Sequence, residues 1–153
     1  MNIVKDTDKG YNNLLKLMKQ QKVSADIGIF YNAGQVDGVS IAEYATHNEY
    51  GTKKIPERSF LRSTFDEQEK NAFRIIGLDI KMSVLKPTFS LSKSIAKGAE
   101  YFRSEVVKKI KTADQWAVKN RPSTIARKGK NQPLINKGIM WKAVIWKIVK
   151  IGG

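Results

Sequence analysis

The chain contains no cysteine and a single histidine, His47, among its 153 residues. The lack of thiols excludes disulfides, zinc–thiolate sites and a cysteine nucleophile, and one histidine excludes a histidine-rich metal site. No apolar run approaches the ~18 residues that a membrane-spanning helix needs. The first ten residues carry acids and no apolar segment, which is unlike a signal peptide. We therefore expect no cofactor, no metal and no membrane partner.

Acidic residues are scarce in the second half of the chain. Residues 1–80 hold 11 Lys and Arg and 11 Asp and Glu, whereas residues 81–153 hold 17 Lys and Arg but only three acids. The whole net charge of +14 therefore lies in residues 81–153. Such asymmetry indicates an anionic partner, either nucleic acid or an acidic protein surface, although a solvated lysine-rich surface would give the same count.

Apolar spacing predicts four helices and two strands. Helical periodicity occurs over residues 6–21, 60–84 and 90–111, and Ser40 with Glu43 forms a capping-box sequence that opens a short helix to Tyr50. In the helix of 60–84 the predicted apolar face is formed by five residues: Phe65, Ala72, Phe73, Ile76 and Ile80. Alternation predicts a strand at 23–30, residues 143–151 (AVIWKIVKI) also indicate a strand, and a turn-rich loop is expected at 31–39.

This order predicts one α+β domain over residues 1–153, in which a small antiparallel or mixed sheet packs with two long helices. Residues 52–58 should form an extended arm, because Pro56 disfavours helical geometry at Ile55. Residues 113–133 lack a clear period, so we expect an exposed basic loop there. Asn136 could cap a helical turn at 137–142.

The sequence does not predict an enzyme. Glu43 lies four residues before His47, on one helical face, and such a pair could in principle transfer protons. No nucleophile motif and no glycine-rich phosphate loop accompany it. The remaining acids are scattered over predicted helix surfaces, which is unlike a metal-dependent nuclease site.

Two spaced segments resemble a known family. The first comprises residues 43–52 (EYATHNEYGT) with 55–62 (IPERSFLR), and the second comprises 123–129 (STIARKG) with 133–140 (PLINKGIM). Both are similar to motifs of tailed-phage neck and tail-completion proteins, the HK97 gp10-like and Mu gpG-like virion morphogenesis families. Ser59 stands where that family often has a second proline, and Asn136-Lys137 replace its usual Asp-Thr.

The resemblance implies a structural subunit of the head–tail connector ring, located in the virion after assembly in the host cytoplasm. Its partners would be copies of itself, most simply six with twelve as the alternative, the portal-side adaptor, and the tail terminator or tube. The ring would form part of the DNA channel. The alternative function is sequence-independent nucleic-acid binding through the basic half, without a recognisable DNA-binding motif.

Two sets of residues are the candidate sites. Arg58 and Arg62 are placed to pair with acids of a neighbouring subunit, such as Glu43 or Glu49, and the arm is the better interface candidate because Phe60 and Leu61 suit a core. The predicted subunit interface comprises Glu43, Glu49, Tyr50, Ile55, Pro56, Arg58 and Arg62. The basic residues expected to face DNA or acidic proteins are Lys93, Lys97, Lys108, Lys111, Lys119, Arg121, Arg127, Lys128 and Lys130.

Overall fold

A computed structural model describes residues 9–20, 23–86 and 88–150. Within these ranges the longer helices are α1 (Lys9–Gln20), α2 (Ile41–Tyr50), α3 (Arg62–Ser83) and α4 (Leu91–Lys111). The short helices are η1 (Tyr31–Ala33), α5 (Ala113–Trp116), α6 (Pro122–Lys128) and α7 (Ile139–Lys142). The strands are β1 (Val23–Gly28), β2 (Gln35–Val36), β3 (Val39–Ser40) and β4 (Ile145–Lys150). The predicted α+β class is confirmed.

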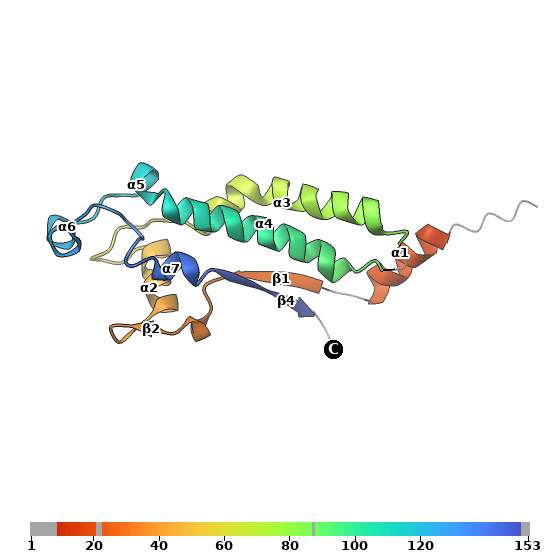
Figure 1. Cartoon of the computed structure of the whole chain (residues 1–153), viewed down its shortest axis with the longest axis horizontal. Helices are drawn as coiled ribbons and strands as arrows, with labels where there is room; N and C mark the ends of the chain where they lie inside the picture. Colours follow the sequence, from red (N-terminus) through yellow and green to blue (C-terminus); the bar gives the residue numbers. More distant parts are fainter. Residues whose placement is uncertain (1–8, 21–22, 87, 151–153) are drawn as a thin grey trace, which may run out of the picture.

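The long helices α3 and α4 form an antiparallel pair along the long axis of the molecule (Figure 1). Gly98 lets the two helices approach closely, because a Cβ there would lie 2.5 Å from Cγ1 of Ile76. Nearer the start of α3, the rings of Phe65 and Phe102 meet edge to face at 5.8 Å. Dispersion and apolar burial along this seam hold α3 to α4.

The main sheet has two antiparallel strands, β1 and β4, with Val23 opposite Lys150 and Gly28 opposite Ile145. Helix α4 packs on both strands, whereas α3 packs on α4, which gives the order α3, α4, sheet. A two-stranded sheet is marginal alone, so the cover from α4 stabilises it. The core between them contains Phe60, Phe102, Val106, Ile110, Leu134, Met140 and Val144.

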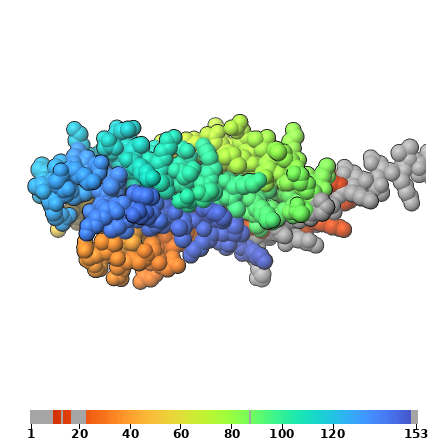
Figure 2. Space-filling view, viewed as in Figure 1, coloured from red at the N-terminus to blue at the C-terminus, as the bar shows by residue number. Residues whose placement is uncertain are grey.

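A second hairpin lies inside residues 31–39, where the sequence predicted only a loop. Strands β2 and β3 pair antiparallel across Asp37 and Gly38, which have φ of 53° and 78°. Positive φ at both central residues is the geometry of a tight two-residue hairpin turn, and Asp-Gly is a favoured pair for it. Figure 2 shows this orange region against the blue segment around α7, at the same end of the molecule as α6.

Three further predictions need correction. The basic loop of 113–133 contains two helices, α5 and α6, so it is not structureless. In α3, Phe65 and Phe73 are 48% and 64% exposed, so the predicted apolar face is only partly buried. Helix α7 begins at Ile139, and its N-cap residue is Gly138 in a left-handed conformation, so the predicted cap by Asn136 is wrong. The ends of the predicted helix 6–21 and strand 143–151 fall partly outside the described residues.

Candidate interface site at the α2–α6 end

The predicted arm folds back on helix α2. It leaves the helix through Gly51, whose φ of 74° and ψ of 170° suit only glycine. Thr52 then closes a turn, because its hydroxyl accepts the backbone N–H of Ile55 at 3.0 Å and its own N–H donates to Ile55 O at 2.7 Å. The N–H of Arg58 donates to Asn48 O at 2.7 Å. The arm is therefore fixed along α2 within its own chain.

Glu49 is buried at the end of α2, with 4% of its surface exposed. Its carboxylate accepts the Ser59 hydroxyl at 2.8 Å and the backbone N–H groups of Phe60, Leu61 and Arg62 at 2.8, 2.9 and 3.0 Å. Nε of Arg62 donates to it as well, at 3.0 Å. These N–H groups belong to the start of α3, where helices leave donors unpaired and negative charge is stabilised.

This network controls the ionisation of Glu49. Burial alone would raise the pKa of its carboxyl. The N–H groups of Leu61 and Arg62, the Ser59 hydroxyl and the Arg62 side chain oppose burial, and they hold the pKa below its ordinary value. Glu49 is thus an ionised cap that joins the end of α2 to the start of α3.

Arg58 is equally buried, with 6% of its surface exposed, but its partners are neutral. Its Nε donates to Val118 O at 2.8 Å, and Nη1 donates to Asn48 Oδ1 at 3.1 Å. Its Nη2 donates to Lys119 O and Asn120 Oδ1, both at 3.3 Å. Burial lowers the pKa of the Arg58 guanidinium, and the interaction with Tyr44 opposes this effect only in part. Arg58 therefore joins α2 and the arm to residues 118–120 without a neutralising carboxylate.

The prediction that Arg62 and Glu49 pair across a subunit boundary is therefore wrong. These two residues pair with each other within one chain. Arg62 also donates to Glu57 at 2.7 Å and lies 4.4 Å from the centre of the Tyr50 ring. Glu43 and Tyr50 remain exposed, and Ile55 and Pro56 are half-buried at the surface of the arm. These four residues are still available for contact with another molecule.

Helix α6 places the basic residues of the predicted loop. It starts with Pro122 at its first turn and ends at Gly129, which has φ of 69°. Proline at the start and left-handed glycine after the end are ordinary helix signals, so the sequence contained the information for this helix. Apolar periodicity did not predict this helix, because it has only seven residues and no apolar stripe.

The arm and α6 enclose a depression of about 230 Å³, called here the basic depression. Its cations are Lys54, Arg58, Arg121, Arg127 and Lys128. Its other lining residues are Tyr44, Asn48, Ile55, Pro56, Asn120, Thr124 and Asn136. No acid lines it, and none of these cations enters an ion pair of the described residues. Burial, then Lys130, Arg58 and Arg127, lower the pKa of Lys128.

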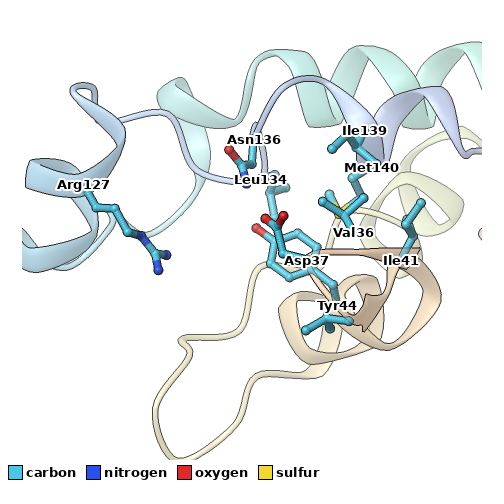
Figure 3. A pocket seen from close by; sticks show the side chains of 10 residues that line it. Val36, Asp37, Ile41, Tyr44, Arg127, Leu134, Asn136, Ile139 and Met140 are labelled. Carbon is cyan, nitrogen blue, oxygen red and sulfur yellow. The ribbon is translucent and has the colours of Figure 1, made fainter. Parts of the chain in front are cut away.

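An apolar depression of about 220 Å³ adjoins the basic one, and the two share Tyr44, Arg127 and Asn136 (Figure 3). Its lining residues come from the β2–β3 hairpin, α2 and the segment around α7: Val36, Asp37, Val39, Ile41, Leu134, Ile139 and Met140. In Figure 3 the Arg127 side chain extends from α6 toward this group. The site therefore combines an apolar half with a cationic half.

The lysines predicted on α4 differ from those near α6. Lys97 pairs with Asp79, and Lys108 lies 3.7 Å from Glu105. Lys111 lies over the Trp141 ring at 4.1 Å, while Lys93 is exposed. Lys119 and Lys130 are exposed beside the basic depression. The predicted basic residues thus separate into a partly neutralised group on α4 and an uncompensated group around α6.

Nowhere in residues 9–20, 23–86 and 88–150 do three or more His, Cys, Asp or Glu side chains gather as a metal would require. His47 is half-buried on α2. No helix in these ranges is both long and apolar enough to cross a membrane.

Comparison with known proteins gave no match to a family model, to a curated protein or to a solved structure.

Proposed function

We propose that this chain is a structural subunit of the connector ring between the head and the tail of a tailed phage. The observation that carries the proposal is the meeting of its two motif segments. Residues 43–62 and 123–140 are far apart in sequence, yet both line the basic and apolar depressions. Arg58, from the first segment, also bonds residues 118–120 just before the second. Segments that build one surface are suited to recognise one partner.

The uncompensated cations around α6 support contact with an acidic partner. A buried guanidinium with neutral partners and four further cations leave a positive potential at this surface. In a ring, that surface would face an acidic patch of an adjacent subunit or of the adaptor or terminator above and below it. Contact through proteins is favoured over DNA because a strongly cationic channel would retard DNA passage.

Purified virions test the proposal directly. Mass spectrometry should detect the chain in particles, and immunogold labelling should place it at the head–tail junction. Light scattering of the purified protein should give the mass of a closed ring, with six copies expected and twelve as the alternative. Absence from the particle would defeat the proposal.

A surface variant provides a matched functional test. Changing Lys119, Arg121, Arg127 and Lys130 to Ala should impair head–tail joining and leave the thermal midpoint of unfolding within a few degrees, because these side chains are exposed. Lys128 is kept, since its Nζ donates to Gln132 O at 2.8 Å. The matched control changes the α4 cations Lys93, Lys97, Lys108 and Lys111, which should affect joining less.

Sequence-independent nucleic-acid binding is the second candidate function. The exposed cations at the α6 end favour it, because phosphate contacts need unpaired Lys and Arg. A monomer that binds DNA tightly, with strong salt dependence and without virion association, would support this candidate instead.

A further inference from the structure

A second surface of the chain complements the site at the α2–α6 end. On α3, Phe65, Asp66, Glu69 and Phe73 recur at helical spacing, and this set is called here the α3 patch. Both aromatic rings are about half exposed or more. Neither Asp66 nor Glu69 enters an ion pair of the described residues, although Lys70 lies four residues after Asp66. The patch therefore combines two carboxylates that form no ion pair among the described residues with exposed apolar area.

The α3 patch and the paired depressions have no residue in common. The α3 patch is acidic and aromatic, whereas the paired depressions are apolar and mainly cationic, with Asp37 among the lining residues of the apolar half. In Figure 1, α3 lies alongside α4, whereas α6 lies at the far end of the molecule. Complementary surfaces at different places on one chain favour head-to-tail association of copies, which closes into a ring when the rotation between copies is right.

The apolar half decides between protein and nucleic acid as the occupant. A phosphate backbone would satisfy Arg121 and Arg127 but offers no aliphatic or aromatic side chain to fill the space above Leu134 and Met140. A helix with acids beside aromatic residues supplies both groups at once, as in helix-in-groove recognition. Aromatic anchors in a pocket beside charged pairs are the usual centre of a strong interface.

We propose that the α3 patch of one copy docks into the basic and apolar depressions of a second copy. Phe73 enters the apolar half, the exposed edge of Phe65 covers its rim, and Asp66 and Glu69 face Arg121 and Arg127. The inference rests on the proposed function only in taking such contacts to close into a ring. The pairwise contact itself follows from the two surfaces.

Two variants each remove one side of this contact. Arg127→Glu reverses a charge that both depressions share, and it alters no hydrogen bond found for that side chain in the described residues. Asp66→Lys with Glu69→Lys reverses the patch. Each should weaken self-association about 30-fold or more, because like charges then face one another. Sedimentation velocity across a concentration series measures this, and circular dichroism checks the fold.

Mixing the two variants gives the sharpest result. The unaltered patch of the Arg127→Glu protein can dock into the unaltered depressions of the patch variant, and in the other contact the new glutamate faces the new lysines. The mixture should therefore regain assemblies larger than either variant forms alone, with the two variants alternating. A contact that used the same surface on both copies would not be restored in this way.

Controls match the charge changes. Lys81→Glu alters an exposed cation on α3 that lines neither depression. Asp114→Lys reverses an exposed acid that belongs neither to the patch nor to the depressions. Both controls should associate like the unaltered chain.

A protein that is monomeric at all concentrations, or variants that associate as the controls do, would overturn the inference. Binding of DNA or of an unrelated acidic peptide at the depressions, without self-association, would overturn it as well. Virion localisation with unaffected variants would sink only this contact, and specific dimers of a protein absent from virions would sink only the connector proposal.

Discussion

Two buried charges of the α2–arm region, Glu49 and Arg58, lie nine residues apart and differ in whether their charge is compensated within the chain. Each exposes only 4–6% of its surface. Glu49 is neutralised by Arg62 and by N–H groups at the start of α3, whereas Arg58 has only carbonyl and amide oxygens. The first charge is balanced inside the chain. The second holds its backbone partners in place and leaves its positive charge at the wall of a depression.

The same difference extends over larger regions. Along α3 and α4, Lys97 and Lys109 pair with acids of the facing helix, Asp79 and Glu67. Around α6, no described cation of the basic depression has such a partner. Charge is balanced where helices pack together and is left unbalanced where we expect another molecule to bind. This contrast makes the unbalanced end the better guide to function.

Removing the balanced charge should have the largest effect on stability. In Glu49→Gln, an amide replaces a carboxylate surrounded by N–H donors, and Arg62 loses its partner. We expect the free energy of unfolding to fall by about 2–4 kcal/mol, at the lower end for buried pairs because Arg62 is partly exposed. Urea unfolding followed by circular dichroism measures this.

The control for that variant is Glu57→Gln. Glu57 also bonds Arg62, but it is exposed, so its loss should cost about 0.5 kcal/mol or less. Equal losses in both variants would mean that the buried cap contributes no more than a surface pair.

Gly51→Ala should disturb both buried charges together. A Cβ at Gly51 would lie 2.9 Å from the backbone N of Glu57, and the φ of 74° strains any other residue. We expect a loss of about 2–3 kcal/mol in the free energy of unfolding. Gly77→Ala is the control, because its Cβ meets nothing within 4 Å inside α3 and alanine favours helix. A stability loss confined to the Gly77 variant would contradict the strained turn.

Arg58→Lys tests the unbalanced charge. Lysine keeps the charge but cannot donate to Val118 O, Asn48 and Asn120 together, as the planar guanidinium does. We expect a loss of about 1–2 kcal/mol, with faster amide hydrogen exchange near residues 118–120. Unchanged exchange there would show that the segment does not depend on Arg58. Arg74→Lys, on the exposed face of α3, serves as the control.

Periodicity predicted the helices that pack, and it failed where local chemistry decides. The regular apolar steps of residues 90–111 predicted α4 nearly to its ends, because one face of it must cover β1 and β4. Alternation over residues 23–30 likewise predicted β1. Periodicity missed α6, whose signals are Pro122 and Gly129, and the β2–β3 hairpin, whose signal is the Asp37-Gly38 turn.

The candidate site was predicted in composition but not in geometry. The sequence indicated that the arm and the basic segment 119–130 matter, and both segments line the basic depression. It did not indicate that Glu49 and Arg62 pair with each other, or that Arg58 joins the two segments. Those pairings depend on the chain reversal at Gly51 and on contacts across about 60 residues, which no local pattern encodes.

The pH dependence of stability should differ between Glu49 and Arg58, and this difference is the smallest of the expected effects. The pKa of Glu49 is lowered on folding, so its contribution is fully present above the unfolded pKa, near 4.5, and is lost as pH falls through the folded pKa. The pKa values of Asp79 and Glu100 are also lowered, chiefly through Lys97 and Arg103. Their contributions to the stability of the fold are therefore lost in the same pH range.

Those two acids are common to every variant, so differences between variants cancel them. The stability difference between the unaltered chain and Glu49→Gln should be constant above about pH 5.5 and shrink by about 1 kcal/mol or more toward pH 3. The difference for Arg58→Lys should stay flat, because neither side chain titrates there. Thermal unfolding from pH 3 to 7 measures both. A flat Glu49 difference would mean that its partners bind the neutral carboxyl as well as the ionised one, and the contrast between the two charges would then reduce to hydrogen bonding alone.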